Sequence, residues 1–150
     1  MRVWRRPGRV LGVPDGARAV SIGDLVGLTL VAATAVDTAH EGVNDELHLD
    51  TADGRRFRFF HDQNCCETVS IEDICGDLAD LVGSPITQAE EEVSGQDVNP
   101  PGVPVPTYQD SFTWTFYKFA TIKGSVTVRW YGESNGYYSE SVDLRVGPTP

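Results

Sequence analysis

The sequence lacks long apolar segments, and this argues against a membrane or secreted protein. Its longest apolar stretch, residues 25–36, is interrupted by Gly27 and Thr29 and is shorter than the roughly 20 apolar residues of a membrane-spanning helix. Arginines are frequent near the N-terminus, but no apolar stretch of about 7–15 residues follows them, as it would in a signal peptide. We therefore expect no membrane contact and a cytoplasmic location.

Cysteine is also scarce. The three cysteines, Cys65, Cys66 and Cys75, all lie within 11 consecutive positions. An odd, clustered set suits reduced thiols better than the disulfide framework of a secreted domain. This agrees with a cytoplasmic location.

Positive charge is missing from the middle of the chain. No Lys or Arg occurs between Arg58 and Lys118, a region that carries many of the acidic residues behind the formal net charge of −10. Such a surface cannot displace counterions from phosphates, so we expect no general nucleic-acid binding. A basic partner or a DNA-mimicking surface is compatible with this charge, and a solvated acidic surface is the simpler interpretation.

Enzyme motifs are missing as well. The chain has no phosphate-binding Gly-rich loop, no Walker pattern and no G-x-S-x-G elbow, which favours a non-enzymatic protein.

With 150 residues the chain has about the size of one domain. We expect an irregular basic arm over residues 1–20 and a single β-rich domain over 21–150, with a Pro-rich loop at about 94–108.

Strand patterns dominate what is present. Residues 46–61 alternate as a hairpin whose three-residue loop, 52–54, gives four matched cross-strand pairs: Leu49 with Phe57, Leu47 with Phe59, Asp50 with Arg56, and His48 with Arg58. A second hairpin with its loop at 134–136 would pair Val128 with Val142, Val126 with Leu144, and Arg129 with Ser141. A helical turn over 21–27 precedes the remaining strand segments, at 28–36, 85–93 and 111–121.

One segment has helical spacing. Ser70 is a candidate N-cap, apolar residues follow at helical intervals through Val82, and Gly83 and Pro85 would end the helix. The pattern predicts an α+β fold that is mainly antiparallel, a single twisted or half-closed sheet of about six to eight strands with this helix packed on it. Glu72, Asp73 and Asp77 would then be ordinary acids near the start of a helix rather than catalytic carboxylates.

The string HDQNCCE at residues 61–67 gathers an imidazole, thiols and carboxylates. A zinc ion would need His61, Cys65, Cys66 and Cys75, but this is not a standard zinc spacing, and neighbouring cysteines on an extended chain point to opposite faces. No other cofactor is expected. The simpler alternative is that the cysteines are buried as small apolar residues and His61 hydrogen-bonds locally.

A cysteine nucleophile is a second option for the same string. His61 would act as its base and Glu67 or Asp62 would orient the imidazole. The acidic surroundings argue against this reaction, because they would raise the pKa of a thiol.

Aromatic residues crowd the last three strand segments, and alternation places half of them on the outer face of a sheet. Flat rings and cations there can stack on a planar ligand or fill a subunit interface, Lys118 included. The candidate ligand-binding residues are Tyr117, Arg129, Trp130, Tyr131, Glu133, Asn135, Tyr137 and Glu140.

Three strings support a family assignment: HDQNCCETVSIEDICGDL at 61–78, FTWTFYKFATIKG at 112–124 and WYGESNGYYSE at 130–140. They resemble a family of small uncharacterised proteins found in many phages and bacteria, over roughly residues 21–146. The family lends no activity and no functional residues. The resemblance implies a phage or prophage origin and an accessory role.

Three functions then compete. The first is a non-enzymatic accessory protein that binds a host factor or sequesters a small, nucleotide-like ligand. The second is a virion-associated component that contacts neighbouring subunits or copies of itself. The third is a metal-dependent or thiol enzyme centred on His61, Cys65 and Cys66.

Overall fold

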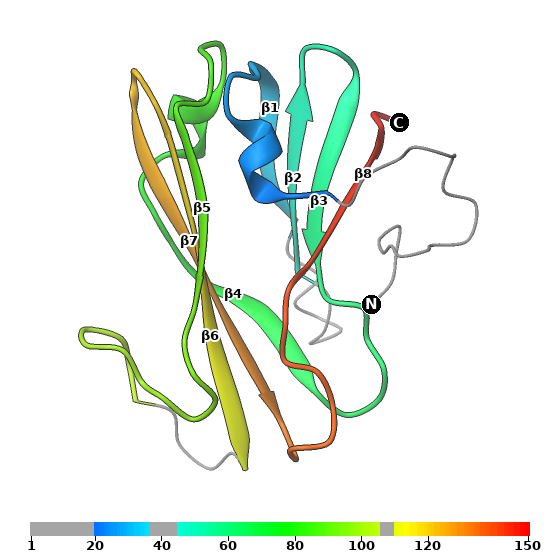
Figure 1. Ribbon diagram of the computed structural model, residues 1–150, viewed down its shortest axis with the longest axis vertical. Helices are drawn as coiled ribbons and strands as arrows, with labels where there is room; N and C mark the ends of the chain where they lie inside the picture. Colours follow the sequence, from blue (N-terminus) through cyan, green and yellow to red (C-terminus); the bar gives the residue numbers. More distant parts are fainter. Residues whose placement is uncertain (1–19, 37–44, 106–109) are drawn as a thin grey trace.

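A computed structural model describes residues 20–36, 45–105 and 110–150. Two four-stranded antiparallel sheets face each other (Figure 1). One sheet contains, in spatial order, β1 (Leu30–Val36), β2 (Glu46–Thr51), β3 (Arg55–Phe60) and β8 (Asp143–Pro148). The other contains β4 (Thr68–Cys75), β7 (Gly124–Ser134), β6 (Ser111–Thr121) and β5 (Gln88–Val93). The predicted arm lies almost wholly outside the described residues.

The core lies between the two sheets. Phe59 of β3 packs edge-on against Tyr117 and Phe119 of β6, with ring centroids 4.9 and 5.9 Å apart. Val128 and Trp130 of β7 are fully buried in the same cluster. Aligned sheets with interdigitating inner side chains are the usual way for two half-apolar sheets to bury their surface.

The prediction of a single sheet with a packed helix is therefore wrong. Within the described part of the chain the helical elements are two 3-10 turns, η1 (Ile22–Leu25) and η3 (Leu78–Leu81). The first lies in the predicted turn at 21–27, capped by Ser21 and Asp24. No helix among the described residues is long and apolar enough to cross a membrane.

A bulge explains why β4 resembles a helix in sequence. Opposite β7, Ile71 faces Trp130 and Ile74 faces Val128, and the register shifts between Ile71 and Asp73. The extra residue puts two inward side chains three positions apart, which is also the spacing of neighbours on one side of a helix. Asp77, rather than Ser70, is the cap that starts η3.

The two hairpin predictions have opposite outcomes. All four pairs predicted between β2 and β3 are confirmed. The hairpin around residues 134–136 is wrong, because β8 pairs with β3 in the opposite sheet and β7 pairs with β4 and β6. Residues 135–142 therefore form a connection that crosses from one sheet to the other, at the lower end of the molecule in Figure 1.

Candidate functional site

The crossing connection is fixed to β6 and β7 by Glu140. This side chain is almost fully buried, and its two carboxylate oxygens accept hydrogen bonds from Thr113 Oγ1 at 2.7 Å and Ser134 Oγ at 2.6 Å. Gly132 allows the close approach, because a Cβ atom there would lie 2.5 Å from the backbone oxygen of Glu140. Two hydrogen bonds and one close backbone approach thus set the position of the connection.

A pocket of 470 Å³ lies beside this anchored connection, at the end of the sandwich opposite η3. Its walls come from β5, from the inner face of β6 and from the connection. They consist of Glu91, Val93, Gln96, Thr113, Thr115, Gly136, Tyr138, Glu140, Ser141 and Val142. The lining offers hydroxyls, an aromatic ring and two carboxylates, and no Lys, Arg, His or Cys in the described part of the chain belongs to it.

Glu91 connects the pocket to the core. Its Oε2 accepts a hydrogen bond from the hydroxyl of Tyr117 at 2.6 Å. Burial, followed by the nearby carboxylate of Glu91, raises the pKa of Tyr117 well above its usual value, so this phenol stays protonated and donates. One carboxylate oxygen of Glu91 is therefore already hydrogen-bonded to another residue of the protein at the pocket wall.

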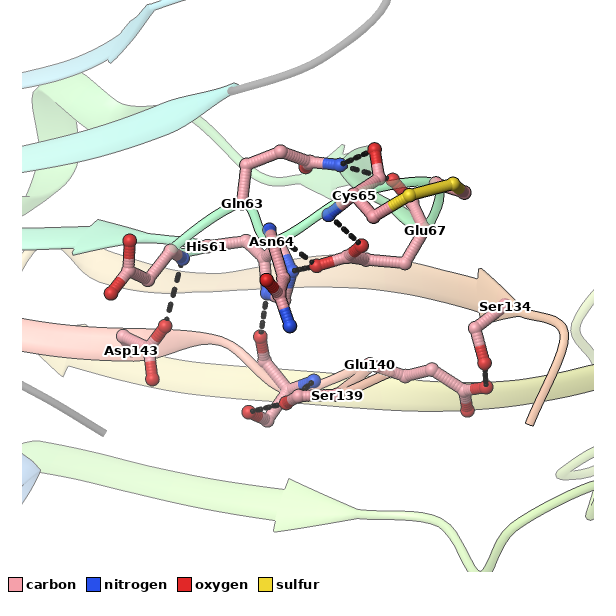
Figure 2. A network of polar contacts seen from close by, with 12 residues as sticks. His61, Gln63, Asn64, Cys65, Glu67, Ser134, Ser139, Glu140 and Asp143 are labelled. Carbon is pink, nitrogen blue, oxygen red and sulfur yellow. Dashed lines mark hydrogen bonds and ion pairs between the residues drawn. A yellow bond between two sulfur atoms is a disulfide. The ribbon is translucent and has the colours of Figure 1, made fainter. Parts of the chain in front are cut away.

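A second polar cluster lies on the other side of the connection (Figure 2). His61 and Glu67 are shielded from solvent, with side chains 2% and 0% exposed, and Nε2 of His61 lies 2.8 Å from Oε2 of Glu67. Nδ1 of His61 lies 2.7 Å from the backbone oxygen of Ser141. The imidazole thus links the segment after β3 to the wall of the pocket.

Glu67 accepts hydrogen bonds from three groups. Besides His61, the backbone N–H groups of Asn64 and Cys65 donate to it at 2.9 Å each. Burial raises the pKa of Glu67, but the bonds from His61, Cys65 and Asn64 outweigh burial and lower it to about 2. The two nitrogens of His61 thus face two acceptors, the carboxylate of Glu67 on one side and the carbonyl of Ser141 on the other.

The cysteines do not assemble with His61. Cys65 and Cys66 are exposed and joined by a disulfide, whereas Cys75 is a free, exposed thiol at the end of β4. The expectation of reduced thiols is therefore wrong for the adjacent pair, which lies in a bend rather than on an extended strand. Among the described residues no group of three or more His, Cys, Asp or Glu could hold a metal. Both ring nitrogens of His61 are hydrogen-bonded to oxygen atoms of Glu67 and Ser141 rather than to a thiol.

The structure separates the predicted ligand-binding residues. Glu140 lines the pocket, and Tyr117 reaches its edge through Glu91. Trp130 is fully buried in the core, and its Nε1 has no hydrogen-bond partner in the described structure. Tyr137 is 89% exposed, and Asn135 is exposed beside it on the connection.

Arg129, Tyr131 and Glu133 alternate with the core residues of β7 and so lie on the outer face of its sheet. Nε of Arg129 donates to Glu72 at 2.6 Å, and its guanidinium lies over the ring of Trp114. Tyr131 also packs on Trp114, whose Nε1 donates to Asn99 at 3.0 Å. These residues form a packed outer face, with the 94–105 loop across part of it.

Sequence reasoning missed most of the pocket. Thr113, Thr115 and Glu91 lie on correctly located strand segments, but their place at a cavity depends on the crossing connection, which the predicted hairpin had removed. Alternation could have placed Thr113 and Thr115 on the inner face of β6 with Tyr117. The two threonines, at alternate positions in line with the aromatic core residues of the same strand, were the available signal.

Comparison with known proteins gives a family and no activity. A family model described as a domain of unknown function (DUF7448) matches residues 21–144. No curated protein and no solved structure matches the chain. The chain therefore belongs to the DUF7448 family of domains of unknown function.

Proposed function

We propose that this protein is a non-catalytic accessory protein that binds a small polar ligand in the pocket formed by β5, β6 and the 135–142 connection. The observation that carries the proposal is the pocket itself, with its two carboxylates and several hydroxyls around 470 Å³. Pockets of this size, with a few convergent polar groups, are the usual sites for small molecules. The phage or bacterial context implied by the sequence resemblance suits an accessory role.

The pocket's chemistry favours binding over catalysis. The described residues that line it include no His, Cys or Lys, so they offer no common nucleophile–base pair. Both oxygens of Glu140 accept hydrogen bonds from neighbouring hydroxyls, which fixes this carboxylate as part of the wall.

The charge of the pocket narrows the class of ligand. Among the described residues the lining has two carboxylates and no cationic side chain, which gives it a negative potential that attracts amino groups and repels phosphates. The hydroxyls of Thr113, Thr115 and Ser141 can bond either amino or hydroxyl groups. We therefore propose a ligand that carries amino or hydroxyl groups rather than a nucleotide phosphate, and Arg129, on the outer face, takes no part.

NMR titration with three probes tests this proposal: putrescine, glucose and adenosine monophosphate. We expect putrescine or glucose to shift the amide signals of Thr113, Thr115 and Ser141, and the nucleotide to shift them least. Glu91→Gln removes one pocket charge at nearly constant shape and should weaken putrescine binding. Glu90→Gln, on the same strand and outside the pocket lining, is the matched control. Shifts confined to the outer face around Trp114 would contradict the proposal.

A further inference from the structure

We propose that Cys65 and Cys66 form a reversible two-electron redox site that exchanges with an external dithiol. This role is separate from ligand binding in the pocket. The two residues are adjacent in sequence, exposed, and joined to each other in the structure. An accessible sulfur–sulfur bond is the target that an attacking thiolate requires.

Stability does not account for this disulfide. A cross-link stabilises a fold chiefly by closing a loop in the unfolded chain, and the effect grows with the number of residues enclosed. Cys65 and Cys66 are neighbours in the sequence, so their bond encloses no other residue. Forming or breaking it therefore leaves the entropy of the unfolded chain nearly unchanged.

The surrounding backbone is held by other contacts. The N–H of Cys65 donates to Glu67, and the side chain of Gln63 donates to the backbone oxygens of Cys65 at 3.2 Å and Glu67 at 2.6 Å (Figure 2). None of these bonds involves a sulfur atom. After reduction the bend should keep its shape and still present the two thiols side by side, ready to close again.

The exchange balances with a dithiol as reductant. One thiolate of the dithiol attacks one sulfur of the pair, forms a mixed disulfide and releases the other cysteine as a thiolate. The second thiol of the reductant then displaces the first cysteine. The dithiol loses two electrons and two protons and becomes a disulfide, while Cys65 and Cys66 become two thiols. An oxidised dithiol reverses the reaction.

Cys75 provides an internal contrast. Its thiol donates to Asp73 at 3.4 Å, and this carboxylate raises the pKa of the thiol, which lowers its reactivity. The experiment therefore uses the full chain with Cys75→Ser, so that only the adjacent pair can react.

The Cys75→Ser protein is treated with oxidised and then reduced dithiothreitol, followed each time by N-ethylmaleimide and mass measurement. We expect no maleimide on the oxidised monomer, two on the reduced one, and a return to none on reoxidation. The unfolding midpoint in urea should be the same in both states. In the Cys66→Ser, Cys75→Ser control, oxidation should leave Cys65 open to maleimide or joined to another molecule. Two reactive thiols after oxidation, dimers as the only oxidised product, or a lower midpoint on reduction would overturn the proposal.

Discussion

Nε2 of His61 lies 2.8 Å from Oε2 of Glu67 in a place that solvent does not reach, and the other ring nitrogen bonds Ser141. The sequence suggested His61 and Glu67 as the base and the orienting group of a thiol enzyme, whereas in the structure they form a buried link between two segments. It ties the bend that carries the cysteines to the connection that forms one wall of the pocket. The HDQNCCE string is thus organised around a buried hydrogen bond between His61 and Glu67.

Replacing Glu67 with Gln should lower the free energy of unfolding by about 1–3 kcal/mol, the usual cost of leaving a buried hydrogen-bond donor without its acceptor. The two oxygens of Glu67 accept hydrogen bonds from three donors, whereas Gln has only one side-chain oxygen. The NH₂ group of Gln would therefore face a donor where Glu67 has an acceptor. Urea unfolding measures the change. Asp53→Asn, in the exposed ion pair with Arg55, is the control and should have a much smaller effect. Equal losses in the two variants would contradict a structural role for the buried pair.

Acid should remove the stabilisation from Glu67 in a defined pH range. Its pKa is about 2 in the folded protein against a usual value of 4.5, so the unfolded chain binds the proton more tightly. The contribution is therefore complete above pH 4.5 and is lost as the pH falls toward about 2. Urea unfolding of wild type and Glu67→Gln across this range should show their difference shrinking with acid. A constant difference would show that Glu67 does not titrate in this way.

Gly132→Ala should displace the crossing connection. The new Cβ would lie 2.5 Å from the backbone oxygen of Glu140, which cannot rotate away as a side-chain tip could. We expect a loss of about 1–3 kcal/mol in unfolding free energy, typical of overpacking, together with weaker probe binding in the pocket. At Gly23 the nearest atom would be 3.7 Å from a new Cβ, so Gly23→Ala is the control for an added methyl group. Normal stability and binding in Gly132→Ala would rule out this close approach.

Asn99→Ala should expose the aromatic outer face. Trp114 is only 2% exposed, and its Nε1 donates to Asn99, so the substitution leaves a buried donor without an acceptor. The expected cost is about 1–3 kcal/mol in unfolding free energy. Val105→Ala, at a residue 78% exposed on the same loop, should change stability by less than about 0.5 kcal/mol. Similar effects from both would mean that Asn99 does not hold the loop on Trp114.

Local pairing could be predicted for the β2–β3 hairpin, because its apolar face and its charged face agree. Between β2 and β3, the pairs Leu49 with Phe57 and Asp50 with Arg56 agree on one register, and a slip by one residue would break both. The 111–121 strand was likewise predicted with the bounds it has. The family resemblance is consistent with the family model over residues 21–144, although its motifs are not tested by that match.

Long-range arrangement could not be predicted, for two physical reasons. The bulge in β4 gives Ile71 and Ile74 the spacing of a helix, so periodicity alone favoured the wrong element. Val128 and Leu144 face one core from opposite sheets, and apolar alternation does not distinguish such facing residues from hydrogen-bonded neighbours. The pocket could not be predicted without knowing that β7 and β8 lie in different sheets, because the connection between them forms one of its walls.

Native mass spectrometry of the full chain purified from bacterial cells tests the central claim, ligand binding in the end pocket, most directly. Val93 and Val98 make a matched pair at 53% and 52% exposure, and only Val93 lines the pocket. Val93→Trp should fill the pocket, and Val98→Trp should not. We predict a small molecule on wild type and on Val98→Trp that is missing from Val93→Trp. A bare wild-type protein, or equal retention by both variants, would contradict the account.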